Sequence, residues 1–177
     1  MYEQGFTLIE LMITLAIAAI IISFAAPSFK EIIDNNRVSS RANDFIASLA
    51  LAKSEAVKRN ANVQIVPTAG GGDWSDGYKI GIDLNGNNLF DDTVDGVAEK
   101  TLKIMGAPKS GVTVEGKDDE DNPMTKIEYN SFGGITVAGT FVFAATRPTY
   151  ACDRTIKLSS SGVNSISKES QPCRHET

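Results

Sequence analysis

A single acidic residue, Glu10, lies inside the most apolar stretch of the sequence. The stretch runs from Phe6 to Ala26, 21 residues with no other ionisable side chain. A carboxylate in a membrane-length apolar helix costs a few kcal/mol, so it needs a function and a partner. On a helix that starts near Phe6, Glu10 lies only about 6 Å along the axis from residue 6, close to the positive end of the dipole. The residues alone leave two interpretations open: an ion pair with a neighbouring chain, and a carboxylate that sits in interfacial water.

A second group of oxygen-bearing side chains has the spacing of a cation site. Four of them occupy positions 1, 3, 5 and 9 of an EF-type calcium loop: Asp83, Asn85, Asn87 and Asp91. However, the glycine of the loop falls at position 4 instead of 6, and Val94 stands at position 12 in place of Glu. The pattern therefore favours a polar hairpin turn around Asn-Gly, with a metal site as the alternative.

The C-terminal part of the chain is locally basic, although the net charge is −5. Five cations there could form a phosphate-binding patch: Arg147, Arg154, Lys157, Lys168 and Arg174. The alternative is a set of scattered surface charges, because Asp153, Glu169 and Glu176 lie among them. The acidic balance of the whole chain excludes a generally basic nucleic-acid binder.

Enzymatic chemistry has little support in the sequence. The one histidine, His175, is third from the C-terminus, and no nucleophile–base arrangement is recognisable. Cys152 and Cys173 form an even pair, which in an exported protein favours a disulfide over two free thiols. We therefore expect a non-enzyme without a cofactor.

Two kinds of element must position these residues. The apolar stretch 6–26 has the length of a membrane-spanning helix and is too long for a signal-peptide core. After Pro27, apolar residues continue at helical spacing: Phe29, Ile32, Ile33, Val38, Ala42, Phe45, Leu49, Ala52 and Ala56. This predicts one helix of about 50 residues that ends near Asn60, is kinked near Pro27, and has a stripe in its second half that a sheet must cover.

The remainder predicts that sheet. Short β-branched runs separated by turn residues occupy 62–68, 77–83, 100–105, 111–115, 126–130, 140–146, 154–158 and 163–167. Strands and helices do not alternate, so the sheet should be mostly antiparallel. The expected fold class is α+β, with a long N-terminal helix packed on a β-rich head at 61–177.

The opening residues Gly5-Phe6-Thr7-Leu8-Ile9-Glu10 resemble the processing site of type IV pilins and the related secretion pseudopilins. The resemblance implies a pilin fold, a leader peptide at 1–5, cleavage between Gly5 and Phe6 by a prepilin peptidase, and methylation of the new amine of Phe6. It also implies that Glu10 pairs with the methylated terminus of an adjacent subunit. Pro27 stands where this family often places a helix-bending proline.

The segments "LALAKSEAVKRN" (49–60) and "WSDGYKIGIDLNGNNLFDD" (74–92) resemble the H-type group, which contains the secretion pseudopilin H and the FimT/FimU-like minor pilins. Some FimT-like members bind DNA through a Gly-Arg-x-Arg motif. The corresponding residues Gly162-Val163-Asn164-Ser165 have no arginine. The resemblance thus makes DNA a partner that is not favoured.

Together these observations predict a minor type IV pilin that takes part in pilus assembly or priming at or near the filament tip. The alternatives are a DNA-binding minor pilin for natural transformation and an H-type pseudopilin of type II secretion. The expected partners are other major and minor pilins through the helix, the prepilin peptidase and the inner-membrane assembly platform. Helix segments 6–26 and 27–60 would place the chain in the inner membrane with a periplasmic head, and later in the pilus.

Overall fold

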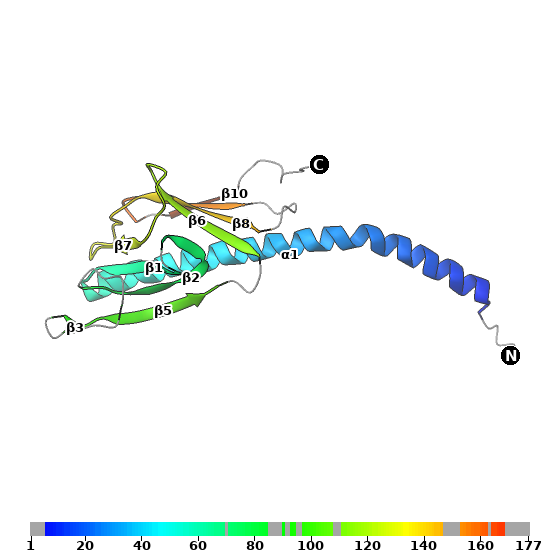
Figure 1. Ribbon diagram of the computed structural model, residues 1–177, viewed down its shortest axis with the longest axis horizontal. Coiled ribbons are helices and arrows are strands. Elements are labelled where there is room, and N and C mark those ends of the chain that lie inside the picture. Colours follow the sequence, from blue (N-terminus) through cyan, green and yellow to red (C-terminus); the bar gives the residue numbers. More distant parts are fainter. Residues whose placement is uncertain are drawn as a thin grey trace.

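One long helix and a β-rich head make up the protein (Figure 1). The computed structural model describes residues 6–69, 71–84, 90, 93–94, 97–107, 111–146, 153–162 and 164–168. The head packs against the C-terminal half of the helix, and the N-terminal half extends beyond it. The predicted α+β class is confirmed.

The helix α1 spans Leu8–Arg59, 52 residues or about 78 Å. Thr7 caps its N-terminus by accepting a hydrogen bond from the Glu10 amide at 3.3 Å. Asn60 ends it in the left-handed conformation, with φ of 51°, directly after two basic residues that suit the negative end of the dipole. The extent predicted from periodicity is confirmed, and Figure 1 shows that the N-terminal half bends away from the axis of the C-terminal half.

The head contains two four-stranded antiparallel sheets instead of the single sheet that the sequence suggested. The first has the order β5-β2-β1-β7, formed by Lys100–Gly106, Asp73–Ile82, Val63–Ala69 and Ile127–Tyr129. The second has the order β10-β9-β8-β6, formed by Asn164–Lys168, Arg154–Leu158, Gly139–Ala145 and Val112–Asp118. An unpredicted two-stranded ladder joins β3 (Thr93–Val94) to β4 (Val97–Ala98).

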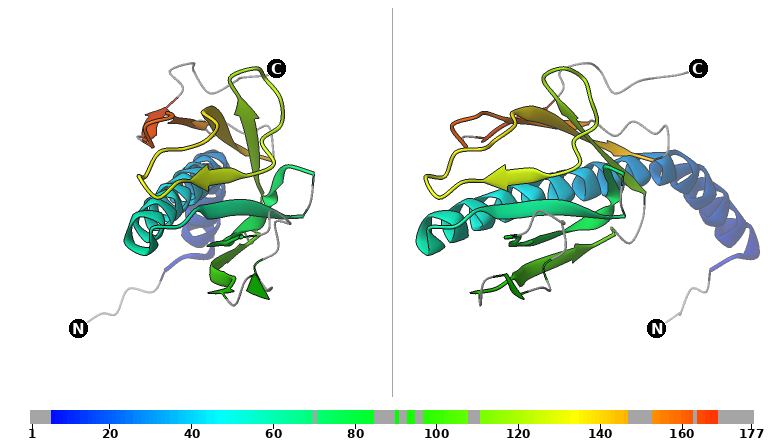
Figure 2. Two further views of the ribbon diagram at one scale, coloured as in Figure 1. Left: turned by 90° about the vertical axis from the view of Figure 1, so that its left-hand side faces the viewer. Right: turned by 60° about the vertical axis from the view of Figure 1, so that its left-hand side comes forward.

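Both sheets pack against α1, on different sides of it (Figure 2). They also contact each other where β2 begins. The Val114 amide in β6 donates to Ser75 Oγ at 3.1 Å, and the Trp74 indole N–H donates to the Met124 carbonyl at 2.7 Å. Met124 in turn donates its amide to the Gly116 carbonyl in β6 at 2.9 Å. The head is therefore one packed unit around the helix.

The core lies between α1 and the two sheets. Phe45 is at its centre: its ring centroid is 6.0 Å from that of Trp74, 5.3 Å from Tyr78 and 4.8 Å from Phe141. Six stripe residues of the helix are fully buried: Val38, Ala42, Phe45, Leu49, Ala52 and Ala56. The prediction of a covered stripe is thus confirmed from residue 38 onward.

The acidic run at 118–121 forms an ordered turn. The Asp118 carboxylate accepts hydrogen bonds from the amides of Glu120 and Asn122, and Lys117 forms a 2.9 Å ion pair with Asp121. The bonds from Asn122, followed by that from Glu120, lower the pKa of Asp118. The side chains of Glu120 and Asp121 are exposed to solvent.

Candidate functional site

The N-terminal half of α1 presents an apolar surface to its surroundings. Its large apolar side chains from Phe6 to Ile22 are all more than half exposed: Phe6, Leu8, Ile9, Leu11, Met12, Ile13, Leu15, Ile17, Ile20, Ile21 and Ile22. No helix within the described residues has an apolar stretch long enough to cross a membrane. Exposed apolar area of this extent is rare on a monomeric surface and indicates an interaction site.

Glu10 lies in the first turn of this apolar half. Its amide is fixed by Thr7 Oγ1, and the Leu11 amide donates to the Thr7 carbonyl at 3.2 Å. The Glu10 side chain is exposed, so the fold of this chain supplies no buried partner for it. The geometry therefore leaves the Glu10 carboxylate accessible near residue 6, at the positive end of the helix.

The neck, which we define as residues 29–37, lies between the apolar half and the head. Phe29, Ile32 and Ile33 are 63%, 55% and 47% exposed, although they continue the same stripe that is buried from Val38 onward. The prediction that a sheet covers the whole stripe is wrong for these three residues, because both sheets end before they reach the neck. These three side chains thus give the neck an exposed apolar face.

Arg41 fixes the helix where the neck enters the head. It is only 7% exposed, which is unusual for a charged side chain. Its guanidinium donates from Nη2 to the Gly106 carbonyl at 2.9 Å and lies 5.6 Å from the centroid of the Tyr78 ring. The Tyr78 hydroxyl donates to Ser48 Oγ at 3.0 Å, about two helical turns after Arg41. These contacts tie the helix to β2 and to the edge strand β5.

Two cations of the predicted phosphate-binding patch, Arg154 and Lys157, lie on opposite faces of strand β9. Arg154 shares the inward face of β9 with buried Ile156 and Leu158, and its Nη2 donates to Ser39 Oγ on the helix at 3.0 Å. Lys157 has the opposite, exposed face of the strand. The backbone of Lys168 pairs with Arg154. Arg147 and Arg174 lie outside the described residues.

The proposed calcium loop is described only at its first position. Asp83 follows β2 and is 7% exposed, and the nearby Glu99 carboxylate accepts the Leu84 amide at 2.8 Å. The other three predicted ligands lie outside the described residues: Asn85, Asn87 and Asp91. Within the described part of the chain, no group of three or more acidic, histidine or cysteine side chains could hold a metal ion.

Several further predictions fall on residues that the structure does not describe. Gly5 lies outside the described residues, and so do Cys152 and Cys173 with their predicted disulfide. The backbone at Pro27 is helical, and its proposed role as the kink stays a prediction.

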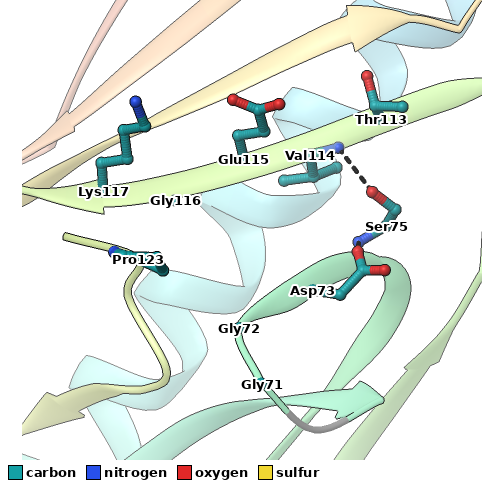
Figure 3. A pocket seen from close by; sticks show the side chains of 10 residues that line it. All are labelled: Gly71, Gly72, Asp73, Ser75, Thr113, Val114, Glu115, Gly116, Lys117 and Pro123. Atoms are coloured by element: carbon teal, nitrogen blue, oxygen red, sulfur yellow. Dashed lines mark hydrogen bonds between the residues drawn. The ribbon is translucent and has the colours of Figure 1, made fainter. Parts of the chain in front are cut away.

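A pocket of about 370 Å³ lies where β2 and β6 meet, and none of the predicted assembly, metal-binding or phosphate-binding residues lines it. Figure 3 shows β6 on one side, and Pro123 and the segment from Gly71 to Ser75 on the other. The ionisable side chains at its rim are exposed, and the pKa of Lys117 is raised by its hydrogen bond to Asp121. The pocket marks the gap between the sheets and brings no reactive groups together.

Comparison with known proteins identifies the class of the chain. The family described as "Type II transport protein GspH" matches residues 41–162, about two thirds of the chain. The "Prokaryotic N-terminal methylation motif" matches residues 1–26.

Solved structures share the fold. A type IV minor pilin of Pseudomonas aeruginosa, FimU, is 19% identical with a TM-score of 0.59, over 78% of this chain and 96% of that one. The minor pseudopilin EpsH of the Vibrio cholerae type 2 secretion system is 12% identical with a TM-score of 0.53, over 76% of this chain and 99% of that one. The two structures are of a minor pilin and a minor pseudopilin, and neither is an enzyme. The chain therefore belongs to the GspH family and is a pilin-class subunit with an N-terminal methylation motif.

Proposed function

We propose that this protein is a minor type IV pilin that takes part in the assembly or priming of a pilus, at or near the filament tip. The observation that carries the proposal is the exposed apolar half of α1, which begins with the methylation motif and continues into the uncovered neck. A helix that is apolar on every side needs lipid or other helices around it. Assembly would move this helix from the membrane, at 6–26, into a bundle with other pilin helices.

Processing at Gly5 and Phe6 prepares the helix for this exchange. A prepilin peptidase would cut between these residues and methylate the amine of Phe6, which remains cationic. Glu10 of one subunit would then pair with the Phe6 amine of the next, which offsets the cost of a carboxylate in an apolar environment. The inner-membrane assembly platform would bring the subunits together.

The test of this role is Glu10→Ala, with Ser23→Ala as the matched control. Ser23 lies on the same apolar half and donates only to the Ile20 carbonyl of its own helix. We expect membrane insertion and cleavage to be unchanged in both variants, and recovery in sheared filaments to fall about tenfold for Glu10→Ala alone. Normal recovery of Glu10→Ala would contradict the role of Glu10.

The second candidate is an H-type pseudopilin of a type II secretion system. EpsH has the same fold and belongs to such a system. Deletion of the gene separates the two candidates, because a pilus role predicts loss of surface pili with normal secretion. Loss of secretion with normal pili would instead assign the chain to the secretion system.

A further inference from the structure

The turn between β7 and β8 holds an aromatic side chain out into solvent on a rigid base. Asn130 Oδ1 accepts hydrogen bonds from the amides of Phe132 and Gly134, each at 3.0 Å. The Gly133 amide donates to the Asn130 carbonyl, and the Asn130 amide to the Gly134 carbonyl, both at 2.9 Å. Four hydrogen bonds thus close a five-residue turn, and Phe132 is at its tip.

The turn is also fixed to the C-terminal end of the helix. Gly133 has a φ of 79°, and a Cβ at this position would lie 2.9 Å from Lys53 Cε and 3.4 Å from Val57 Cγ2. The Lys53 ammonium donates to the Gly162 carbonyl at 3.1 Å, which joins the β9–β10 turn to the same place. Because helix and turns are in contact, Phe132 is held in position before any partner arrives.

Phe132 is 92% exposed, more than any other large apolar side chain of the described residues. Val57, which flanks its turn, is 52% exposed. We call these two residues the distal patch. Single exposed apolar residues are common, but an aromatic ring on a rigid turn loses little conformational entropy on binding. Rigid aromatic anchors of this kind are typical hot spots of protein interfaces.

The distal patch and the neck lie at opposite ends of the head (Figure 1). Along α1, Val57 and the middle of the neck are about 24 residues apart, which corresponds to about 36 Å. The two apolar surfaces therefore cannot meet within one chain. A contact between them would be heterologous, and repeated heterologous contacts generate open filaments.

We propose that the distal patch docks on the apolar neck of a neighbouring pilin-class subunit in the same filament. The inference rests on the proposed assembly role. The partner surface follows from the helix, because the neck continues the same helix face through which the N-terminal halves would bundle. A neighbour in that bundle would therefore present its neck near the head of the next subunit.

The size of the contact determines when it forms. The exposed area of Phe132, Val57, Phe29, Ile32 and Ile33 amounts to about 500–600 Å². This is well below the roughly 1,200 Å² that a stable independent interface buries. The contact therefore forms between subunits that their N-terminal helices already hold together, and isolated chains do not dimerise through it.

The test is site-specific photo-crosslinking in cells that assemble filaments. A benzophenone amino acid replaces Phe132 in the full chain, and mass spectrometry identifies the crosslinked peptide. We expect it to come from the helix segment just before the head of a pilin-class subunit, corresponding to residues 29–37. The same probe at Ile104, which is 63% exposed on the edge strand β5, should not label a neck. Crosslinks from position 132 to heads, to the N-terminal apolar half, or to no pilin would overturn the proposal.

Substitutions at position 132 test the docking contact independently. Phe132→Ala should reduce recovery in filaments about tenfold, while Phe132→Leu and the control Ile104→Ala stay within about twofold of the unmodified chain. Equal recovery of all variants would overturn the docking contact. Failure of the assembly role would look different, because the unmodified chain itself would then be absent from filaments.

Discussion

The buried hydroxyl of Tyr78 makes the stability of the head depend on pH in the alkaline range. Burial raises the pKa of Tyr78 above its ordinary value of 10.0, and the hydrogen bond to Ser48 opposes the shift. The folded state therefore holds the phenolic proton at a pH where the unfolded chain releases it. Its contribution to stability is complete below about pH 10 and is lost as pH rises through the folded pKa.

We expect Tyr78→Phe to lower the free energy of unfolding by about 1 kcal/mol at neutral pH, because Ser48 loses its partner. Above pH 10 the variant should lose stability less steeply than the unmodified chain, by up to about 1.4 kcal/mol per pH unit. Fluorescence of the single, fully buried Trp74 reports unfolding at each pH. Parallel pH profiles for the two proteins would contradict the assignment.

Some residues of the functional surface could be recognised from the sequence and others could not. Glu10 stands out because a carboxylate is rare within an apolar run. Arg41 does not, since its burial depends on a carbonyl in β5 and a ring in β2, both far away in the sequence. Phe132 has a local signal in the sequence, because an Asn and two glycines around one aromatic residue indicate a tight turn that exposes the ring.

At the scale of elements, the helix and its stripe hold the head together. Phe45 contacts aromatic rings from both sheets, so its removal leaves a cavity that neither sheet can fill alone. We expect Phe45→Ala to reduce the free energy of unfolding by about 3–5 kcal/mol. Urea unfolding of the full chain in detergent, followed by Trp74 fluorescence, measures the loss.

The matched control for this variant is Ser54→Ala, on an exposed face of the same helix. Ser54 donates only to the Leu51 carbonyl, so the change should stay within about 0.5 kcal/mol. A loss of less than about 1 kcal/mol for Phe45→Ala would show that the two sheets are stable without the central ring.

The elements themselves were largely predictable, but their pairing was not. The predicted helix matches α1 to within two residues at each end, and β-branched runs between turn residues predicted eight strands, β9 with its observed bounds. The division into two sheets depends on non-local pairing: β1 pairs with β7, some 60 residues later. The point along the helix at which the head begins to cover it could not be predicted either, because the exposed Ile33 and the buried Val38 are both apolar and lie on the same stripe.

At the scale of the whole molecule, α1 belongs to two different environments. One face of its C-terminal half is buried in the head, whereas the large apolar side chains described in its N-terminal half and in the neck are exposed. A helix without packing is only marginally stable and opens locally. The boundary lies between Arg37, which has a side chain 49% exposed and an ion pair with Asp34 on its own helix, and the buried Arg41.

Trypsin can locate this boundary in the unassembled chain. We expect cleavage after Lys30 and Arg37 and protection at Arg41, which leaves a resistant fragment that begins at Val38. Intact-mass measurement over a time course identifies the products, and cleavage after Arg41 as fast as after Arg37 would contradict the boundary. An unassembled subunit thus combines a protease-resistant head with a protease-sensitive neck. Proteolysis at the neck would remove unassembled copies from the cell, while copies packed in a filament are protected.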